Sequence, residues 1–330
     1  MRGARITVPA EEGPAVYHVM TRTVNAEKLF DHVAKEVLRQ QLWRIADFCG
    51  VEILTYAILA NHFHILVRIP QRTVIPDEEL LRRYRVLYPR PTRYQTARLD
   101  VIRAQLATNG PDAVGWRRRQ LALMGNLSQY MKLLKQRFSI WFNKTHRRCG
   151  TLWSERFKSV LVQGKKRLLQ TIAAYIDLNC VRANLVEDPK DYRFCGYAEA
   201  VAGSPRARAG IGQVTGEPVS RWSESQCTYR LLLFGTASAP RARGRSLPLE
   251  HFLAARQSAG QLPLTTILHC RVRYFSDGAV LGTQAFVATA LAALRRKGGS
   301  FPRTGPRRLP AIADWGDLAV LRRLRRVDCG

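Results

Sequence analysis

Two apolar, β-branched runs joined by a three-residue turn constrain this fold more than any other feature. The runs cover 51–59 and 62–69, and Leu59-Ala60-Asn61 forms the turn. This pattern is typical of paired strands in a buried hairpin. Side chains two residues apart in a strand project from the same face, so His62 and His64 stand side by side while Phe63 points into a core. The second strand therefore offers two imidazoles to one ion, and the alternative is a pair of structural histidines on a half-buried sheet.

The neighbouring periodicities extend the hairpin into a larger α+β unit. The expected elements are a strand at 16–24, a helix from Asn25 to about Phe48, the two hairpin strands, a long helix over 116–145, a strand over 150–162 and a helix over 165–184. The intervening residues 71–115 are rich in arginine and proline, and we expect an insertion with one or two short helices there. The pattern predicts a ferredoxin-like antiparallel sheet backed by helices.

The charge of the chain indicates a polyanionic partner. The sequence has 53 Lys and Arg against 25 Asp and Glu, a formal net charge of +28. Positive side chains in such excess repel one another unless a polyanion neutralises them, so nucleic acid is the favoured partner. An anionic membrane surface is the competing explanation. The sequence has no long uncharged apolar run and no signal peptide at its start, so we expect no membrane association.

A change in composition divides the chain after Gly203. The residues beyond it are enriched in Arg, Pro, Ser and Gly, with amphipathic segments such as 285–294. We expect a catalytic domain over 1–205 and a mostly helical, basic C-terminal extension over 206–330 that binds DNA. The seven cysteines form no C-x-x-C pair and are irregularly spaced, which argues against structural zinc and against a disulfide framework. The chain is therefore expected to be cytoplasmic and reduced.

The predicted helix over 165–184 carries a second group of candidate site residues. Tyr175 and Asn179 are four residues apart, so they lie one above the other on one helix face, with Asp177 roughly opposite Tyr175. An amide oxygen can ligate a hard cation, and a phenol can attack a group that the cation holds. The alternative is that Tyr175 packs in the core and Asn179 lies near the helix end.

Together these motifs resemble the single-tyrosine HUH transposases, and most of all the REP-associated tyrosine transposases. The resemblance covers roughly residues 1–200. It rests on Tyr17-His18-Val19 with Arg22, Asn61-His62-Phe63-His64, Trp153-Ser154-Glu155-Arg156-Phe157-Lys158-Ser159 and Tyr175-Ile176-x-x-Asn179-x-Val181-Arg182. A weaker similarity to the extension of longer members lies at Val272-Arg273-Tyr274-Phe275-Ser276-Asp277-Gly278. Cys180 stands where the family usually has proline, which puts the position of Asn179 in question.

The resemblance implies a transposase that cuts single-stranded DNA near hairpins and rejoins it. Tyr175 would be the nucleophile and would form a 5′-phosphotyrosine with release of a 3′-OH. His62, His64 and Asn179 would hold a divalent metal, Mg²⁺ or Mn²⁺, and imidazole ligands favour Mn²⁺ of the two. The expected partner is single-stranded or hairpin DNA, bound by a monomer or homodimer. The sequence contains no P-loop, and the phosphotyrosine conserves the bond energy, so no nucleotide cofactor is expected.

Basic side chains near these motifs are candidates for contact with the DNA backbone. They are Arg22, Arg117, Arg118, Lys132, Lys135, Arg156 and Lys158. Trp141 and Trp153 are candidates for stacking on unpaired bases, with core packing as the alternative. Two other functions remain open. One is a non-catalytic, domesticated DNA- or RNA-binding protein of the same fold, and the other is a metal-dependent phosphodiesterase that uses activated water, with Tyr175 structural.

Overall fold

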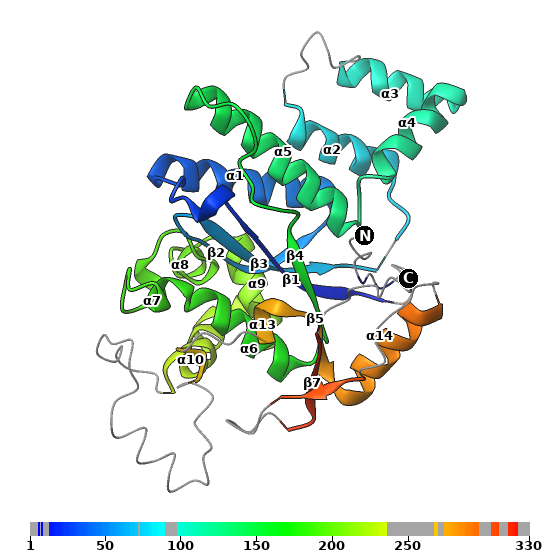
Figure 1. Ribbon diagram of the computed structural model, residues 1–330. Helices are drawn as coiled ribbons and strands as arrows, with labels where there is room; N and C mark the ends of the chain where they lie inside the picture. Colours follow the sequence, from blue (N-terminus) through cyan, green and yellow to red (C-terminus); the bar gives the residue numbers. More distant parts are fainter. Residues whose placement is uncertain are drawn as a thin grey trace, which may run out of the picture.

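A seven-stranded mixed sheet forms the centre of the computed structural model, in the order β2-β3-β1-β4-β5-β7-β6 (Figure 1). The structure describes residues 6, 8, 13–71, 73–89, 98–235, 267–269, 274–296, 305–309 and 316–322. Arg90 and Arg93 of the predicted insertion, Val272 and Arg273 of the C-terminal motif, and all of 236–266 lie outside this part of the chain.

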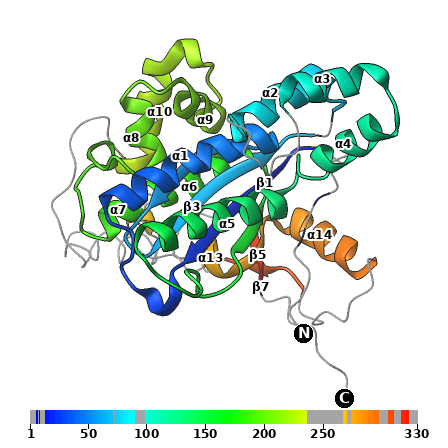
Figure 2. The same cartoon turned by 90° about the horizontal axis from the view of Figure 1, so that it is seen from above.

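The first four strands have the ferredoxin-like arrangement predicted from the sequence. They are β1 (Ala15–Arg22), β2 (Glu52–Ile58), β3 (His62–Ile69) and β4 (Lys158–Val162). β1 lies between β3 and β4, β2 pairs with β3, and all three pairings are antiparallel. Helices α1 (His32–Cys49) and α5 (Leu127–Thr145) pack against each other on one face of this sheet (Figures 1 and 2). The α+β fold is thus confirmed.

The C-terminal extension continues the same sheet. Its strands and long helix are β5 (Gly278–Thr283), α14 (Gln284–Arg296), β6 (Arg307–Arg308) and β7 (Leu318–Arg322). β5 pairs with β4 in parallel and with β7 in antiparallel orientation. The antiparallel sheet expected from the first 200 residues is therefore mixed when its whole width is considered, because the extension adds its first strand in parallel.

The opposite face of the sheet is covered by helices from the second half of the chain. These are α6 (Lys166–Asp177), α7 (Asn179–Arg182), α8 (Gly196–Val201), α9 (Pro205–Thr215), α10 (Trp222–Phe234) and α13 (Tyr274–Asp277). α6 and α9 both pack on β2. The boundary proposed at 205/206 falls in the first turn of α9, where Ala207 and Ile211 are buried.

The first helix begins later than predicted. Asn25 does not cap it, because Asn25 and Ala26 have φ of 51° and 57° within a short 3-10 turn, Val24–Ala26. Asp31 is the actual N-cap, and its carboxylate accepts a hydrogen bond from the backbone N–H of Ala34 at 2.7 Å. Residues 25–30 therefore form a connection between β1 and α1, and Asn25 and Ala26 of this connection line the cleft described below.

Three further elements are shorter than predicted. The helix expected over 116–145 is interrupted at Gly125, which has φ of +60°, and Asn126 then caps α5 through the N–H groups of Ser128 and Gln129. The strand expected over 150–162 is regular only in β4. The helix expected over 165–184 is divided at Leu178 into α6 and α7, followed by the 3-10 turn Pro189–Asp191.

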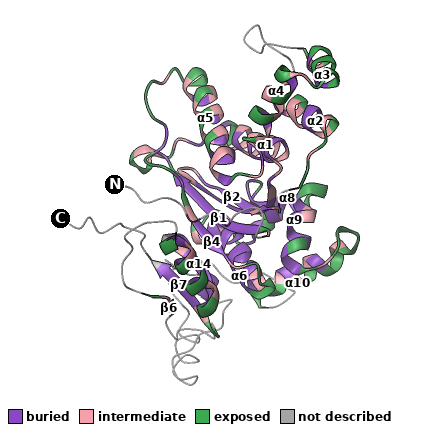
Figure 3. Cartoon of the chain, turned by 90° about the vertical axis from the view of Figure 1, so that its right-hand side faces the viewer, coloured by how far each residue is buried: buried purple, intermediate pink, exposed green. Residues whose placement is uncertain are grey.

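The arginine-rich insertion is helical in the part described. It contains α2 (Asp77–Leu87), α3 (Leu99–Thr108) and α4 (Pro111–Leu121). Figure 3 shows that α3 and α4 carry many exposed residues, whereas β1, β2 and β4 are largely buried. A third 3-10 turn, Val219–Arg221, precedes α10.

Among the described residues, no helix is long and apolar enough to cross a bilayer.

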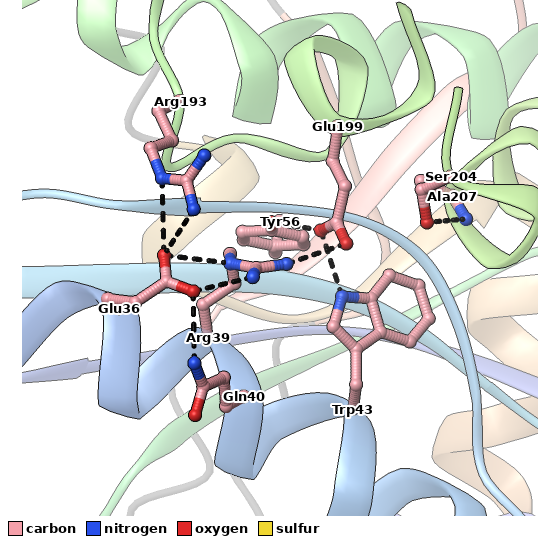
Figure 4. A network of polar contacts seen from close by, with 9 residues as sticks. All are labelled: Glu36, Arg39, Gln40, Trp43, Tyr56, Arg193, Glu199, Ser204 and Ala207. Atoms are coloured by element: carbon pink, nitrogen blue, oxygen red, sulfur yellow. Dashed lines mark hydrogen bonds and ion pairs between the residues drawn. The ribbon is translucent and has the colours of Figure 1, made fainter. Parts of the chain in front are cut away.

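A polar network ties α8 to α1 and β2 (Figure 4). The carboxylate of Glu199 accepts hydrogen bonds from Arg39 at 2.7 Å, from the indole N–H of Trp43 at 2.9 Å and from the hydroxyl of Tyr56. Arg39 also pairs with Glu36, and this hydrogen bond lowers the pKa of Glu36 to about 2. The network fixes the edge of the sheet nearest β2 and lies away from the residues described next.

Candidate active site

One cleft of about 610 Å³ brings together the predicted site residues. Its lining comes from the end of β1, the start of β3, the segment before β4, and helices α6 and α7. The chemically relevant lining residues are Arg22, His62, His64, Glu155, Arg156, Lys158, Tyr175, Asn179, Arg182 and Ser276. The sequence patterns for the histidine pair and for the tyrosine helix therefore describe two walls of a single site.

Strand register explains why the histidines face this cleft. His62 lies opposite Arg22 and His64 lies opposite Met20 in the β1–β3 ladder. Residues directly opposite each other share a face of the sheet, and so does His18, two residues before Met20. The centroids of the His62 and His64 rings are 5.3 Å apart. This is the face on which α6 packs.

The imidazole of His62 is oriented by its neighbour Asn61. The side-chain Nδ2 of Asn61 donates to the carbonyl oxygen of Ala26 at 2.8 Å, which fixes the orientation of the amide. The amide Oδ1 then lies 2.6 Å from Nδ1 of His62. Because an amide oxygen only accepts, Nδ1 of a neutral His62 carries the hydrogen and Nε2 carries the lone pair.

The imidazole of His64 is held by a third histidine. Its Nδ1 lies 2.9 Å from Nε2 of His18, whose Nδ1 lies 2.7 Å from the carbonyl oxygen of Phe275. Burial lowers the pKa of His18 to about 4. Burial also lowers the pKa of His64 well below its usual value, and repulsion from the charged forms of His18 and His62 adds to this shift. Both rings are therefore neutral at physiological pH, and neutral imidazole is the form that binds metal.

Tyr175 lies in the last turn of α6, against the histidine face. Its ring centroid is 6.2 Å from that of His18 and 5.1 Å from that of Phe275, both in edge-on geometry. The ring is only 3% exposed, yet Tyr175 lines the cleft. Among the described residues, the hydroxyl has no hydrogen-bond partner, so no structural role competes for it.

Asn179 lies one turn further, as predicted, at the start of α7. Its Nδ2 donates to the carbonyl oxygens of Tyr175 at 3.3 Å and Ile176 at 3.0 Å, across the junction of the two helices. These bonds fix the orientation of the amide. They engage its Nδ2, so Oδ1 is the atom of the amide that can bind a ligand. Cys180, which stands in place of the family's proline, is buried, and its thiol donates to the carbonyl oxygen of Asp177 at 3.1 Å.

The predicted DNA-contacting residues fall into three places. Arg22, Arg156 and Lys158 line the cleft itself. Lys132 and Lys135 line an adjacent hollow of about 490 Å³ that also contains Arg156.

The remaining two, Arg117 and Arg118, belong to α4 of the insertion and do not line the cleft. Arg117 forms an ion pair with Asp77 at 2.6 Å. Of the two tryptophans considered for base stacking, Trp153 is buried among Phe30, Phe63 and Phe138, which is the core-packing alternative. Trp141 is partly buried against Phe138 and Phe142.

Comparison with known proteins identifies the segment that carries the histidines. Residues 14–78 match the model of a transposase family described as IS200-like. This match confirms the resemblance to the single-tyrosine transposases for the segment 14–78, and it supports a transposase function.

Other comparisons are more distant. A solved structure of a REP-associated tyrosine transposase bound to a REP hairpin aligns with 75% of this chain and 99% of its own, at 12% identity and a TM-score of 0.40. The search of curated proteins gave no match.

The donor set of this cleft fits a divalent metal ion of the predicted kind. Among the described residues, no three His, Cys, Asp or Glu side chains gather to form a metal site. The predicted set differs because its third member is an amide. The hydrogen bonds above leave a lone pair on Nε2 of His62, on Nε2 of His64 and on Oδ1 of Asn179. Two nitrogens and one oxygen with open positions suit Mn²⁺ or Mg²⁺.

Sequence reasoning missed three groups in the cleft. His18 was noted only as part of a motif, and its signal was its even spacing from Arg22 on a strand expected to join the same sheet. Arg182 was likewise noted in the tyrosine motif, without a role. The carbonyl oxygen of Phe275 had no usable signal, since a backbone group is placed by the fold and not by the residue type.

Proposed function

We propose that this protein is a metal-dependent transposase that cleaves and rejoins single-stranded DNA through a covalent bond to Tyr175. The observation that carries the proposal is the convergence of Tyr175, Asn179, His62 and His64 on one basic cleft. The match of residues 14–78 to the IS200-like transposase family supports the transposase function. The specificity for hairpin-flanked single strands is carried over from the sequence resemblance.

The cleft chemistry is suited to phosphoryl transfer. The hydroxyl of Tyr175 would lose its proton and form a bond to phosphorus as the bond from phosphorus to O3′ breaks. This leaves a 5′-phosphotyrosine, and the leaving O3′ takes up a proton to become a 3′-OH. A divalent ion bound by His62, His64 and Asn179 would offset the charge that develops on the nonbridging oxygens. Reversal of the step, with a 3′-OH as nucleophile, would rejoin the strand without an external energy source.

The surrounding charges would orient the DNA backbone. Arg22, Arg156 and Lys158 are exposed at the cleft, and Glu155 is the single acidic residue of its lining. Glu155 pairs with Lys158 at 3.3 Å through exposed side chains, so the pair is weak and can exchange for a phosphate contact. A rigid helix then supplies Tyr175 from the opposite wall, and in-line attack requires an approach of about 3–3.5 Å.

The experiment that tests this proposal is a search for the covalent intermediate. The full-length protein is incubated with labelled hairpin DNA carrying single-stranded flanks and Mn²⁺, and the products are separated under denaturing conditions. We expect a protein–DNA adduct with the wild type and none with Tyr175→Phe. Tyr84→Phe is the matched control, because it removes a tyrosine hydroxyl from α2, outside the cleft. An adduct formed by Tyr175→Phe would assign the nucleophile elsewhere.

The same experiment separates the other two functions. Cleavage by the wild type with no adduct at any time, and with full activity in Tyr175→Phe, would indicate hydrolysis by activated water. Binding of hairpin DNA with neither cleavage nor adduct at any metal concentration would indicate a domesticated binding protein.

A further inference from the structure

A chain of hydrogen bonds connects the C-terminal extension to the candidate metal ligand His64. It runs from the carbonyl oxygen of Phe275 to Nδ1 of His18 at 2.7 Å, and from Nε2 of His18 to Nδ1 of His64 at 2.9 Å. His18 is fully buried and His64 is 7% exposed. Because His18 is fully buried, water does not replace either hydrogen bond. The two hydrogen bonds therefore determine which ring nitrogens of His18 and His64 carry a hydrogen.

The positions of the hydrogens follow from what each atom can do. A carbonyl oxygen only accepts, so Nδ1 of His18 carries a hydrogen. A neutral imidazole has one ring N–H, so Nε2 of His18 has a lone pair and accepts. Nδ1 of His64 must then donate, which places the lone pair of His64 on Nε2.

We propose that His18 is a positioning residue, anchored by the carbonyl oxygen of Phe275, that fixes the tautomer of His64 with its Nε2 lone pair available to a metal ion. This inference rests on the proposed function, in which His64 binds the ion. In the other tautomer of His64, an N–H group would occupy Nε2 and exclude a cation. Buried hydrogen-bond partners of this kind orient metal-binding histidines generally.

The arrangement at His62 is equivalent and supports the assignment. There the amide Oδ1 of Asn61 accepts from Nδ1, at 2.6 Å. Both histidines thus receive a hydrogen-bond acceptor at Nδ1, although the two acceptors come from unrelated parts of the chain. His18 is not itself positioned as a ligand, because both of its ring nitrogens are engaged in this chain.

The inference also assigns a role to the extension beyond DNA binding. Phe275 contributes its carbonyl oxygen to His18 and its ring to Tyr175, whose centroid lies 5.1 Å away. Phe275 is fully buried, and α13 lies against β1 and β4 in the sheet. A segment 257 residues from His18 in sequence therefore completes the interior of the site.

The first test measures the tautomer directly in the metal-free, full-length protein. Long-range ¹H–¹⁵N correlation spectra of histidine-labelled protein distinguish a protonated ring nitrogen from an unprotonated one. We expect His64 with its hydrogen on Nδ1 and an unprotonated Nε2 in the wild type. A hydrogen on Nε2 of wild-type His64 would overturn the inference, and this result needs no variant.

The second test compares two variants of His18 for tautomer and for Mn²⁺ affinity. His18→Gln can accept from His64 and donate to Phe275, whereas His18→Phe fills similar space and can do neither. We expect His18→Gln to keep the tautomer and to bind Mn²⁺ within a few-fold of the wild type. We expect His18→Phe to lose the single tautomer and to bind Mn²⁺ about 10–100-fold more weakly.

Two results of this comparison would overturn the inference. One is a His18→Phe variant with unchanged His64 tautomer and unchanged Mn²⁺ affinity. The other is equal weakening of Mn²⁺ binding in both variants while both keep the tautomer, which would assign His18 to packing alone. If the tautomer changes as expected but no protein, wild type included, binds Mn²⁺, the inference on His18 is supported and the metal site of the proposed function fails.

Discussion

The guanidinium group of Arg182 covers the ring of Tyr175, with its central carbon 4.1 Å from the ring centroid. The same group donates to the carbonyl oxygen of Tyr175 at 2.5 Å and to that of Leu268 at 2.7 Å. One side chain from α7 thus holds the ring of the proposed nucleophile, the backbone of its helix and a segment of the extension. It also brings a positive charge to the cleft that it lines.

Replacement of Arg182 should separate positioning from charge. Lysine keeps the charge, but a single ammonium cannot lie flat on the ring and bridge two carbonyl oxygens. We expect Arg182→Lys to lower the single-turnover cleavage rate by about 10–100-fold, since small misplacements of a reacting group have effects of this size. DNA affinity should change little. Arg182→Met should lower both quantities, and a wild-type rate for Arg182→Lys would mean that charge alone matters.

The residues that line this cleft could be predicted because they lie on regular elements. His62 and His64 follow a period of two on a strand, and Tyr175 and Asn179 follow a spacing of four on a helix. Each pattern is local, so each survives without knowledge of the fold. The match of strand and helix to opposite walls of one cleft then follows from packing a helix on the sheet face that carries the histidines.

The parts of the fold and of the cleft that were not predicted depend on contacts that sequence patterns do not encode. The carbonyl oxygens of Phe275 and Leu268 reach the site because the extension returns to the sheet beside β4, and backbone groups have no residue signature. The break at Gly125 and the turn at Asn25 were missed for a related reason. Both depend on a positive φ, which interrupts an otherwise continuous apolar periodicity.

Loss of either histidine should abolish metal binding without loss of DNA binding. We expect His62→Ala and His64→Ala to weaken Mn²⁺ binding by at least about 100-fold, more than the effect of an outer-sphere partner. Cleavage should be lost, and hairpin binding should persist because the basic residues remain. His32→Ala serves as the control, because His32 is exposed at the start of α1 and lies outside the cleft. Calorimetric titration with Mn²⁺ and a gel-shift assay measure the two properties, and full cleavage by either cleft variant would remove the assignment.

Asp177, two residues after Tyr175, is a fully buried carboxyl group behind the site. It accepts hydrogen bonds from the hydroxyls of Thr55 at 2.9 Å and Tyr229 at 2.6 Å, and from the backbone N–H of Tyr197 at 3.2 Å. Burial nevertheless dominates and raises the pKa of Asp177 to about 7. The group links α6 to β2, α8 and α10.

This shift predicts a pH-dependent contribution to stability. The unfolded chain releases the proton of Asp177 near pH 4, whereas the folded chain keeps it until about pH 7. The folded state therefore binds more protons between these values, and the contribution of Asp177 falls as the pH rises from about 4 to about 7. Asp177→Asn cannot titrate. We expect the difference in unfolding free energy between the wild type and Asp177→Asn to change by a few kcal/mol over this range, as measured by urea denaturation. A constant difference would show that the carboxyl group titrates normally.

The basic residues of the cleft should determine the salt dependence of DNA binding. Each phosphate that a side chain neutralises on a single strand releases counterions, so the slope of log affinity against log salt changes by about 0.7 per contact. Arg156 is exposed and lines both the cleft and the adjacent hollow, and in the described part of the chain it forms no ion pair that DNA binding would break. Arg221 is also exposed, but it lies before α10, outside both hollows.

We therefore expect Arg156→Ala to weaken hairpin binding and to reduce the salt slope by about one contact, while Arg221→Ala leaves the slope unchanged. Both variants remove the same formal charge, so a general effect of net charge would reduce the two affinities equally. Fluorescence anisotropy of labelled hairpin DNA, titrated at several salt concentrations, gives both slopes. Equal slopes for Arg156→Ala and the wild type would place the DNA backbone away from this cleft, and the approach of a phosphate to Tyr175 would then need another route.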